Sequence, residues 1–275
     1  MKIKSNSNDK TYDVAAAGIC LVVYDFLGQS HQECGKILLY KRHGDGADGN
    51  HSASFPCGGM EPGETLYQAA ARELYEECMP TDQRLTINKA KFVEVFTDHL
   101  NRKPRLKSVF FGIEPVENQA VGMIGLMVDR HSDLFKDYLS KLGSSQRLED
   151  YADGSGVSEG VPFWVDTRSD WAVMLEASTY GVYNQAFLYC TYFLNLAIYT
   201  RLHSGLPFTD INGFGFDLEM DVAQFKPKVT SSAVYDVFKP FYREGCDSVV
   251  LWRPYFGDST STSEIYFLET NYEIV

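Results

Sequence analysis

The sequence predicts an α/β fold, in which strands and helices follow one another along most of the chain. Short apolar segments with β-branched and aromatic residues recur between turn-forming stretches, which is typical of strands, and segments with helical signals lie among them. The 275 residues are 44% hydrophobic and 23% charged, the balance of a globular chain with ample apolar material for a core. This length allows one large domain, or one domain with a smaller companion.

The first two predicted elements are strands. Residues 14–25, VAAAGICLVVYD, are strongly apolar and therefore fit a central strand of a sheet. Residues 36–42, KILLYKR, form a second strand after a polar loop. A long loop rich in Gly, Asp, His and Ser then leads to Phe55 and Pro56.

A helix is predicted to begin at Leu66. Thr65 followed three residues later by Gln68 fits a capping box, in which each residue satisfies a backbone N–H of the other. An apolar stripe at helical spacing consists of Leu66, Ala70 and Leu74. Pro80 ends the helix, because proline disfavours helical geometry at the residue before it.

Two further strands are predicted over 85–99 and 108–116, because both stretches are rich in β-branched and aromatic residues. The basic stretch between them, NRKPRLK, is predicted to be a hairpin loop. Residues 117–160 interrupt the pattern and are interpreted as an insertion. Within it, Ser132 is expected to cap a helix over 133–142.

The last part of the chain is predicted to hold a strand over 161–166 and a long helix over about 180–202. The sequence pattern then changes to a loop-rich stretch, so we place a domain boundary near residue 205. Residues 12–205 form the main predicted domain, and 206–275 form a small α+β extension of unknown role.

Charge and composition exclude some classes of protein. The net charge of -12 disfavours a body that holds nucleic-acid backbone, which requires basic surface. The most apolar run, 186–199, is shorter than the ~20 residues of a membrane span. The six cysteines include no CxxC pair, and the N-terminus lacks an apolar leader, so we expect a cytoplasmic protein with free thiols.

Three glutamates, Glu73, Glu76 and Glu77, lie one helical turn apart on the predicted helix, directly after a glycine-rich turn. Like charges at this spacing repel each other. A hard divalent cation such as Mg²⁺ or Mn²⁺ would turn this repulsion into shared attraction, because such ions prefer oxygen ligands. An ion pair between Glu64 and Arg72 would hold the turn against the helix. The alternative is an acidic helix face that is merely solvated.

The same residues resemble the Nudix box, the signature of the Nudix hydrolase family. Gly58, five residues, Glu64, seven residues and then the segment RELYEEC from Arg72 follow its pattern position by position. The match departs from the pattern only at its end, where Met79 replaces a glycine and Pro80 replaces an apolar residue. The resemblance covers about residues 12–203, with 117–160 as an insertion, and implies an α/β/α sandwich built on a mixed sheet.

The resemblance also implies a chemistry, which is divalent-metal-dependent hydrolysis of a nucleoside diphosphate linked to another group. The metal ligands would be Glu73, Glu76, Glu77 and the carbonyl of Gly58, with Mg²⁺ or Mn²⁺ as cofactor, and Glu76 is also expected to act in catalysis. Glu64 and Arg72 would support the box. In some branches of the family the general base lies on a loop before the last strand, and here the candidates are Glu159 first, then Glu149, Asp150 and Asp153.

Basic residues are candidates for binding the substrate phosphates. Arg42 and Arg105 are the leading ones, with Arg102, Lys103 and Lys107 in the same basic loop as Arg105. The alternative is that these residues are ordinary solubilising charges.

Several functions stay open at this point. ADP-ribose or a nucleotide sugar is the favoured substrate, and removal of an mRNA cap is an alternative that the acidic balance disfavours. A non-catalytic nucleotide-binding sensor with a Nudix fold is a second alternative. Such sensors generally lack box carboxylates, whereas this chain retains them. Isomerisation of an isoprenoid diphosphate ranks low, because no cysteine and glutamate pair is placed for it.

Overall fold

The computed structural model describes residues 1–5, 9–24, 35–42, 53–102, 107–114, 119–152, 160–166, 186, 190 and 272–274. Three predicted features lie largely outside these residues: the helix over 180–202, of which only Ala186 and Cys190 are described, most of the extension over 206–275, and the loop that contains Glu159. The prediction of a domain boundary near residue 205 therefore stays a prediction.

The nine described strands form one mixed sheet, and β2 (Thr11–Tyr24) is its longest member. Strand β7 (Gln119–Asp129) runs parallel to β2 along almost its whole length, and β6 (Lys107–Glu114) is antiparallel to β7. On the other side of β2, β3 (Gly35–Arg42) is antiparallel to β2, and both β8 (Gly160–Asp166) and β4 (Ala53–Ser54) pair with β3 in antiparallel fashion. The strands predicted over 14–25, 36–42, 108–116 and 161–166 are therefore confirmed.

Strand β2 is buried on both faces, as its apolar sequence predicts. Ala17, Ile19 and Leu21 point to one face, where they join the cluster that includes helix α1 (Leu66–Cys78). Cys20 lies on the other face, where the thiol of Cys190 donates to its carbonyl oxygen at 3.7 Å. The mixed sheet with helices is thus confirmed.

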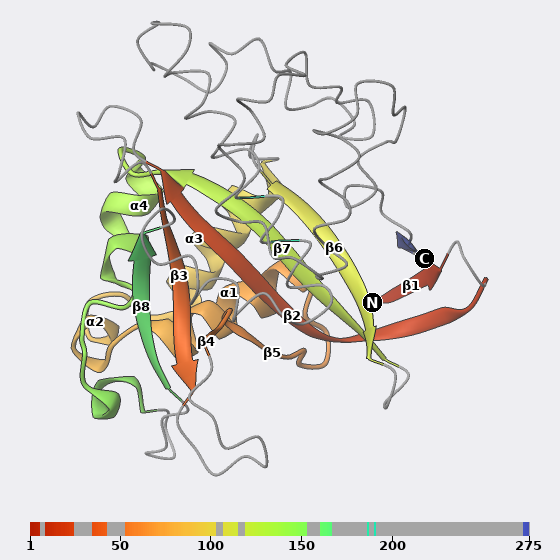
Figure 1. The fold of residues 1–275 in the computed structure, drawn as a ribbon, viewed down its shortest axis with the longest axis horizontal. Coiled ribbons are helices and arrows are strands. Elements are labelled where there is room, and N and C mark those ends of the chain that lie inside the picture. The colour runs from red at the N-terminus through yellow and green to blue at the C-terminus, as the bar shows by residue number, and fades with distance from the viewer. Residues whose placement is uncertain are drawn as a thin grey trace, which may run out of the picture.

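Helix α3 (Lys89–Asn101) corrects the prediction of a strand over 85–99. Together with α1 it covers one face of the sheet, behind β2 and β7 in the view of Figure 1. Its side chains Phe92, Phe96 and Leu100 recur every four residues and are all buried, which is a helical period rather than the period of two of a strand. Asn88 caps the helix by accepting from Lys91 N at 2.8 Å. The stretch NRKPRLK therefore joins a helix to β6 and is not a hairpin loop.

Strand β7 corrects the interpretation of residues 117–160 as an insertion. Residues 119–129 are part of the sheet, and every residue from Ala120 to Val128 except Val121 is buried. The described part of the remainder, up to residue 152, holds three short helices: α4 (Asp133–Asp137), η2 (Leu139–Lys141) and η3 (Leu148–Tyr151). Ser132 caps α4 as predicted, by accepting from Phe135 N at 3.3 Å.

The two ends of the described chain meet at one edge of the sheet. Strand β1 (Lys2–Ser5) is antiparallel to β2 on one side and to β9 (Tyr272–Ile274) on the other, so residues near both ends lie side by side (Figure 1). None of the helices among the described residues is long and apolar enough to cross a membrane.

Candidate active site

The box begins on a short strand at the centre of the sheet. Strand β5 (Cys57–Gly59) is antiparallel to β2, with Gly58 opposite Ala17. The chain then turns at Gly63, whose φ of 88° is one that residues with a side chain rarely adopt. Glu64 N donates to Glu61 O at 3.1 Å and closes this turn.

Helix α1 starts at the predicted capping box. Gln68 N donates to Thr65 Oγ1 at 3.3 Å, and Thr65 N donates to Gln68 Oε1 at 2.9 Å. The predicted apolar stripe Leu66, Ala70 and Leu74 is buried against the sheet, which leaves the glutamates at the margin of the helix that faces the turn. The helix ends at Cys78.

Arg72 is the centre of an ion-pair network. Its side chain is only 8% exposed, and it donates from Nε and Nη2 to the two carboxylate oxygens of Glu64 at 2.8 and 3.0 Å. Nη2 also donates to the carbonyl of Gly59 at 2.5 Å. Nη1 donates to Glu73 at 2.6 Å and to Glu76 at 3.0 Å. One guanidinium thus joins the turn to the helix, as the spacing of Glu64 and Arg72 predicts.

Hydrogen bonding to Arg72 lowers the pKa of a carboxyl group, whereas burial raises it. The hydrogen bond from Arg72 lowers the pKa of Glu64. Burial raises the pKa of Glu73, and the hydrogen bond from Arg72 only partly opposes this effect. The pKa of Arg72 is raised, chiefly by its hydrogen bond to Glu64. A further cation beside Glu73 would offset the burial that raises its pKa.

Glu73 lies directly against Gly58. A Cβ atom at this glycine would overlap the Glu73 carboxyl group, so only glycine allows the carboxylate to approach the turn so closely. Glu77 is also tied to β5, because Cys57 N donates to Glu77 Oε2 at 3.0 Å. Both side chains are thus held at the start of the box, next to the Gly58 carbonyl that the sequence nominates as a ligand.

The donor set suits a hard cation. Glu73, Glu76, Glu77 and the Gly58 carbonyl would supply only oxygen atoms, which is the chemistry that Mg²⁺ and Mn²⁺ prefer. Among the described residues no three acidic, histidine or cysteine side chains already converge as a metal site. Arg72 explains this arrangement, because its guanidinium is the cation shared by Glu73 and Glu76. The residues fit a divalent cation in chemistry, and Glu76 would exchange a partner to bind it.

The exit of α1 shows why the final glycine of the pattern is not needed. Met79 is buried and extended, with φ -90° and ψ 116°, a conformation open to any residue. Arg84 donates to the carbonyls of Met79 at 2.8 Å and Glu76 at 2.7 Å, and Gly143 N donates to that of Cys78 at 2.9 Å. The last carbonyls of the helix thus find partners from elsewhere in the chain.

Two of the four candidates for the general base lie among the residues that the structure describes. Glu159 and Asp153 lie outside the described residues. Glu149 is 63% exposed and paired with Arg147, whose Nε donates to it at 2.8 Å, and Asp150 accepts from the hydroxyl of Ser145. Both of these carboxylates are paired with their own neighbours, and the assignment of Glu159 as general base stays a prediction.

The structure also describes only some of the candidates for phosphate binding. Arg105 and Lys103 lie outside the described residues, and only the backbone of Arg42 is placed, opposite Gly160 in the β3–β8 register. That register brings the backbone of Arg42 next to the residue that follows Glu159. Lys107 donates to Leu100 O at 2.6 Å and to the Tyr67 hydroxyl at 2.9 Å, so it joins α3 to α1.

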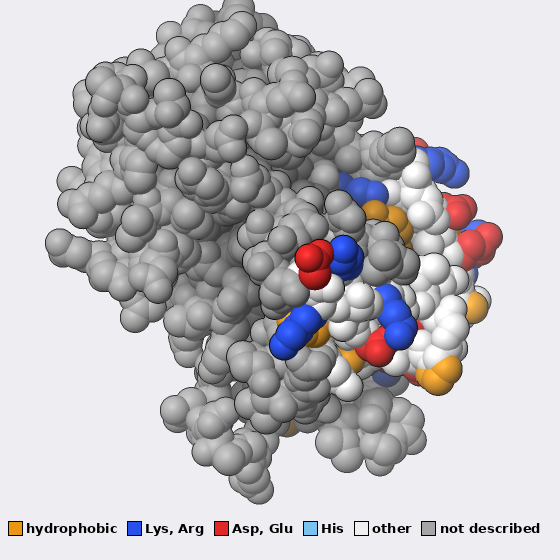
Figure 2. All heavy atoms as spheres, turned by 90° about the vertical axis from the view of Figure 1, so that its right-hand side faces the viewer, with side chains coloured by type: hydrophobic (Ala, Val, Ile, Leu, Met, Phe, Trp, Pro, Cys, Tyr) orange, Lys and Arg blue, Asp and Glu red, His pale blue; other side chains and the backbone are white. Residues whose placement is uncertain are grey.

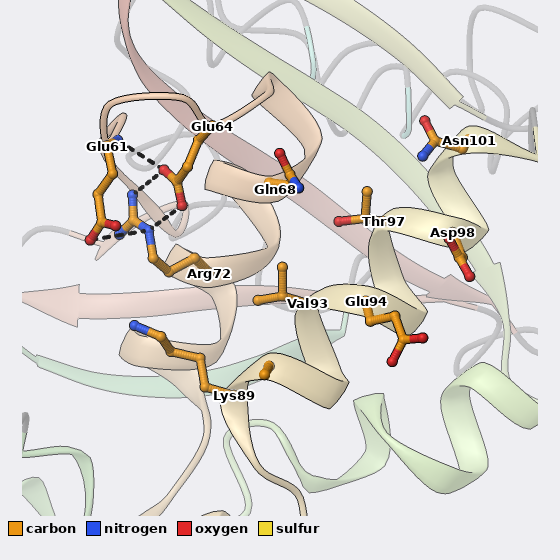
Figure 3. A pocket seen from close by; sticks show the side chains of 11 residues that line it. Glu61, Glu64, Gln68, Arg72, Lys89, Val93, Glu94, Thr97, Asp98 and Asn101 are labelled. Carbon is orange, nitrogen blue, oxygen red and sulfur yellow. Dashed lines mark hydrogen bonds and ion pairs between the residues drawn. The ribbon is translucent and has the colours of Figure 1, made fainter.

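Sequence reasoning missed one residue of the site, Lys89. It is the first residue of α3, and its ammonium group pairs with Glu76 Oε1. It also lines an open groove of about 600 Å³ between α1 and α3, which Figure 3 shows with Glu64 and Arg72 at one end. The spacing of Phe92, Phe96 and Leu100 was the signal that could have placed Lys89 at a helix start.

The structure brings together the glycine-rich turn and the glutamate-bearing helix that the sequence resemblance predicts. Residues 16–123 match the family model described as the NUDIX domain. The matched region contains the box from Gly58 to Glu77 and helix α1.

Several solved structures that are described as hydrolases are similar to this chain. An Ap4A hydrolase from C. elegans in a binary complex is 18% identical with a TM-score of 0.36, and the match covers 66% of this chain and 97% of that chain. A Nudix hydrolase from Nitrosomonas europaea is 13% identical with a TM-score of 0.35, covering 66% and 89% respectively. An ADP compounds hydrolase is 13% identical with a TM-score of 0.34, covering 68% and 80%. Comparison with curated proteins gave no match.

Proposed function

We propose that this protein uses a divalent cation, Mg²⁺ or Mn²⁺, to hydrolyse the pyrophosphate bond of a nucleoside diphosphate linked to another group. The favoured substrates are ADP-ribose and nucleotide sugars. The observation that carries the proposal is the placement of Glu73 against Gly58 while Arg72 pins Glu64 and the Gly59 carbonyl to the same helix. A solvated acidic helix face would require none of these contacts.

Each residue of the box then has a task in the proposed reaction. A bound divalent cation supplies charge neutralisation to the diphosphate oxygens. Glu73 and Glu77 are held by β5 and would keep their oxygens in place for it, whereas Glu76 stands at the open side of the network with 36% of its side chain exposed. Arg72 orients the turn by binding the Gly59 carbonyl. Glu159 is proposed to take the proton from the attacking water.

The acidic surface supports a small substrate. The face shown in Figure 2 carries basic and acidic side chains that are interspersed among its described residues. An RNA path requires a continuous basic surface. The net charge of -12 points the same way, so cap removal from mRNA stays the weaker alternative.

A non-catalytic sensor is the alternative from another class. It is disfavoured because the carboxylates of the box are present and are held by specific contacts at Gly58, Cys57 and Arg72. A sensor that only binds a nucleotide has no need of these carboxylates.

One experiment separates these functions. The protein is incubated with ADP-ribose, nucleotide sugars, dinucleoside polyphosphates and capped RNA, each with Mg²⁺, with Mn²⁺ or with EDTA, and the products are identified by mass. We expect release of a nucleoside monophosphate from ADP-ribose or a nucleotide sugar only when a cation is present. Binding without release from any compound would favour the sensor, and release of a cap nucleotide alone would favour decapping.

A further inference from the structure

We propose that Lys89, which lies outside the Nudix box, binds the diphosphate of the substrate when a cation occupies the box. This inference rests on the proposed function and extends it to a residue on α3. In the structure Lys89 pairs with Glu76, the carboxylate at the open side of the network. When Glu76 turns to a cation, the ammonium group of Lys89 is free to bind phosphate oxygens beside it.

The position of Lys89 is fixed by packing rather than by a flexible loop. Asn88 caps α3 directly before it, and Phe92 packs on Tyr75 of α1 with ring centroids 5.4 Å apart. The hydroxyl of Tyr75 also donates to Ile87 O at 2.7 Å, so the start of α3 is held against the helix of the box. The backbone at Lys89 is thus positioned by the cap and by packing, whereas its side chain is long and flexible.

The two cations that pair with Glu76 differ in what else they bind. Arg72 is 8% exposed and also binds both oxygens of Glu64 and the Gly59 carbonyl, so it stays in place when Glu76 leaves. Lys89 is 48% exposed, and Glu76 is the partner that the structure records for its ammonium group within the described part of the chain. Lys89 is therefore the cation that can exchange its partner Glu76 for the phosphate oxygens of a substrate.

The surroundings of Lys89 leave room for a ligand. The groove of about 600 Å³ between α1 and α3 is lined by Lys89, Arg72, Gln68 and Val93 among others, and it is open to solvent. In Figure 3 the ammonium group of Lys89 points toward the end of the groove where Arg72 and Glu64 lie. A diphosphate held at the box would thus meet the ammonium group at the mouth of this groove.

Charge balance gives a reason for such a residue. Arg72 and Glu64 offset each other, whereas Glu73, Glu76 and Glu77 leave three negative charges, which one divalent cation reduces to one. A diphosphate adds about two more when it binds. The ammonium group of Lys89 beside Glu76 offsets part of this excess negative charge. Opposite charges in contact at a partly exposed site attract each other more strongly than they do in bulk water.

The test compares three variants. Lys89→Met removes the charge and keeps the chain length, Lys89→Arg keeps the charge, and Lys91→Met is the matched control. Lys91 is the next lysine on α3, is 53% exposed and pairs with Glu94 at 3.0 Å. For each variant we measure binding of Mn²⁺ alone by calorimetry, binding of α,β-methylene-ADP in the presence of Ca²⁺, and kcat and KM with ADP-ribose.

For Lys89→Met we expect about tenfold weaker binding of the methylene analogue, which equals the loss of one favourable charge contact. The KM should rise by a similar factor, with a smaller change in kcat. Mn²⁺ alone should bind about threefold more tightly, because Glu76 loses a competitor. Lys89→Arg should recover analogue binding to within threefold, and Lys91→Met should match the wild type.

The opposite pattern overturns the proposal. If Lys89→Met lowers only the free energy of unfolding and leaves analogue binding and KM unchanged, Lys89 is a brace between α3 and α1. If the wild type binds Mn²⁺ but neither binds the analogue nor cleaves any diphosphate, the proposed function fails and the role of Lys89 fails with it. If the wild type cleaves a diphosphate and Lys89→Met is indistinguishable from it, only the role of Lys89 fails.

Discussion

Arg72 and Glu64 form a two-pronged ion pair across the box, with Nε–Oε1 and Nη2–Oε2 separations of 2.8 and 3.0 Å. The two residues lie eight positions apart, on the helix and on the turn before it. Their contact fixes the turn that follows β5, and β5 carries Gly58 and Cys57, against which Glu73 and Glu77 respectively are held. The geometry of the candidate metal ligands therefore depends on an arginine that binds no metal.

Replacing Arg72 with Met is expected to lower the free energy of unfolding by about 3 kcal/mol, because a buried ion pair that loses one partner leaves charge without compensation. Glu64, Glu73 and Glu76 all lose a donor at once. Urea denaturation followed by circular dichroism measures the change. A loss below about 1 kcal/mol would place this network with ordinary surface pairs.

Replacing Gly58 with Ala is expected to reduce turnover at least tenfold while leaving most of the fold intact. The added Cβ would overlap the Glu73 carboxyl group and push it from the turn. Gly59→Ala is the matched control, since its Cβ would meet no atom within 4 Å. Equal activity of the two variants would contradict the role assigned to Glu73.

Replacing Glu77 with Gln is expected to reduce turnover about a hundredfold or more, the scale seen when one group that stabilises developing charge is removed. Gln keeps an oxygen that can accept from Cys57 N, so the free energy of unfolding should change little. Turnover and direct Mn²⁺ binding are both measured. Asp13→Asn on β2, which is 70% exposed and 3.8 Å from Lys2, serves as the control for loss of a carboxylate. Undiminished Mn²⁺ affinity in Glu77→Gln would remove Glu77 from the ligand set.

His99 on α3 predicts a dependence of stability on pH. Burial lowers its pKa, and the charges of Arg102 and Lys107 lower it further. Between this lowered pKa and the pKa of about 6.5 in the unfolded chain, the unfolded state binds more protons. The contribution of neutral His99 is therefore complete above about pH 6.5 and declines as the pH falls through this window.

The check is a comparison of the wild type with His99→Gln in urea denaturation at several pH values from 5 to 8. We expect the wild type to lose stability relative to the variant as the pH falls below about 6.5. Parallel curves for the two proteins would show that His99 does not titrate differently on folding.

Replacing Arg84 with Met is expected to lower the free energy of unfolding by about 2 kcal/mol, because three of its hydrogen bonds end on main-chain carbonyls. These carbonyls belong to Glu76, Met79 and Ala152, at 2.7, 2.8 and 3.0 Å. Arg147→Met is the control, because Arg147 is 68% exposed and pairs with Glu149 on the surface. Thermal denaturation of both variants is the measurement. Arg84→Met should unfold at a lower temperature than Arg147→Met, because Arg84 binds main-chain carbonyls and Arg147 forms a surface ion pair.

The sequence was sufficient for the box because local chemistry determines it. The capping pair Thr65 and Gln68, the turn before α1 and the spacing of Glu64 and Arg72 all act within one short segment. Each of these contacts forms between residues at most eight positions apart. Reasoning from residue types therefore reached the correct geometry there.

Longer-range packing decided the elements that were predicted wrongly. Residues 85–99 have the aromatic and β-branched content of a strand, but the apolar side chains Phe92, Phe96 and Leu100 face α1 and select a helix. Strand β7 contains Gly122 and Gly125, which weaken a strand pattern, yet the ladder with β2 stabilises it along its length. Lys89 was missed for the same reason, because its contact with Glu76 exists only once α3 is a helix beside α1.

The end of α1 has a consequence for how such motifs are identified. A search pattern that demands glycine at position 79 would pass over this chain, although an arginine from α2 (Thr81–Arg84) and the amide of Gly143 replace the function of that glycine. Relatives with a different residue at this position are better identified by donors elsewhere in the chain that bind the last main-chain carbonyls of the helix than by identity at that position.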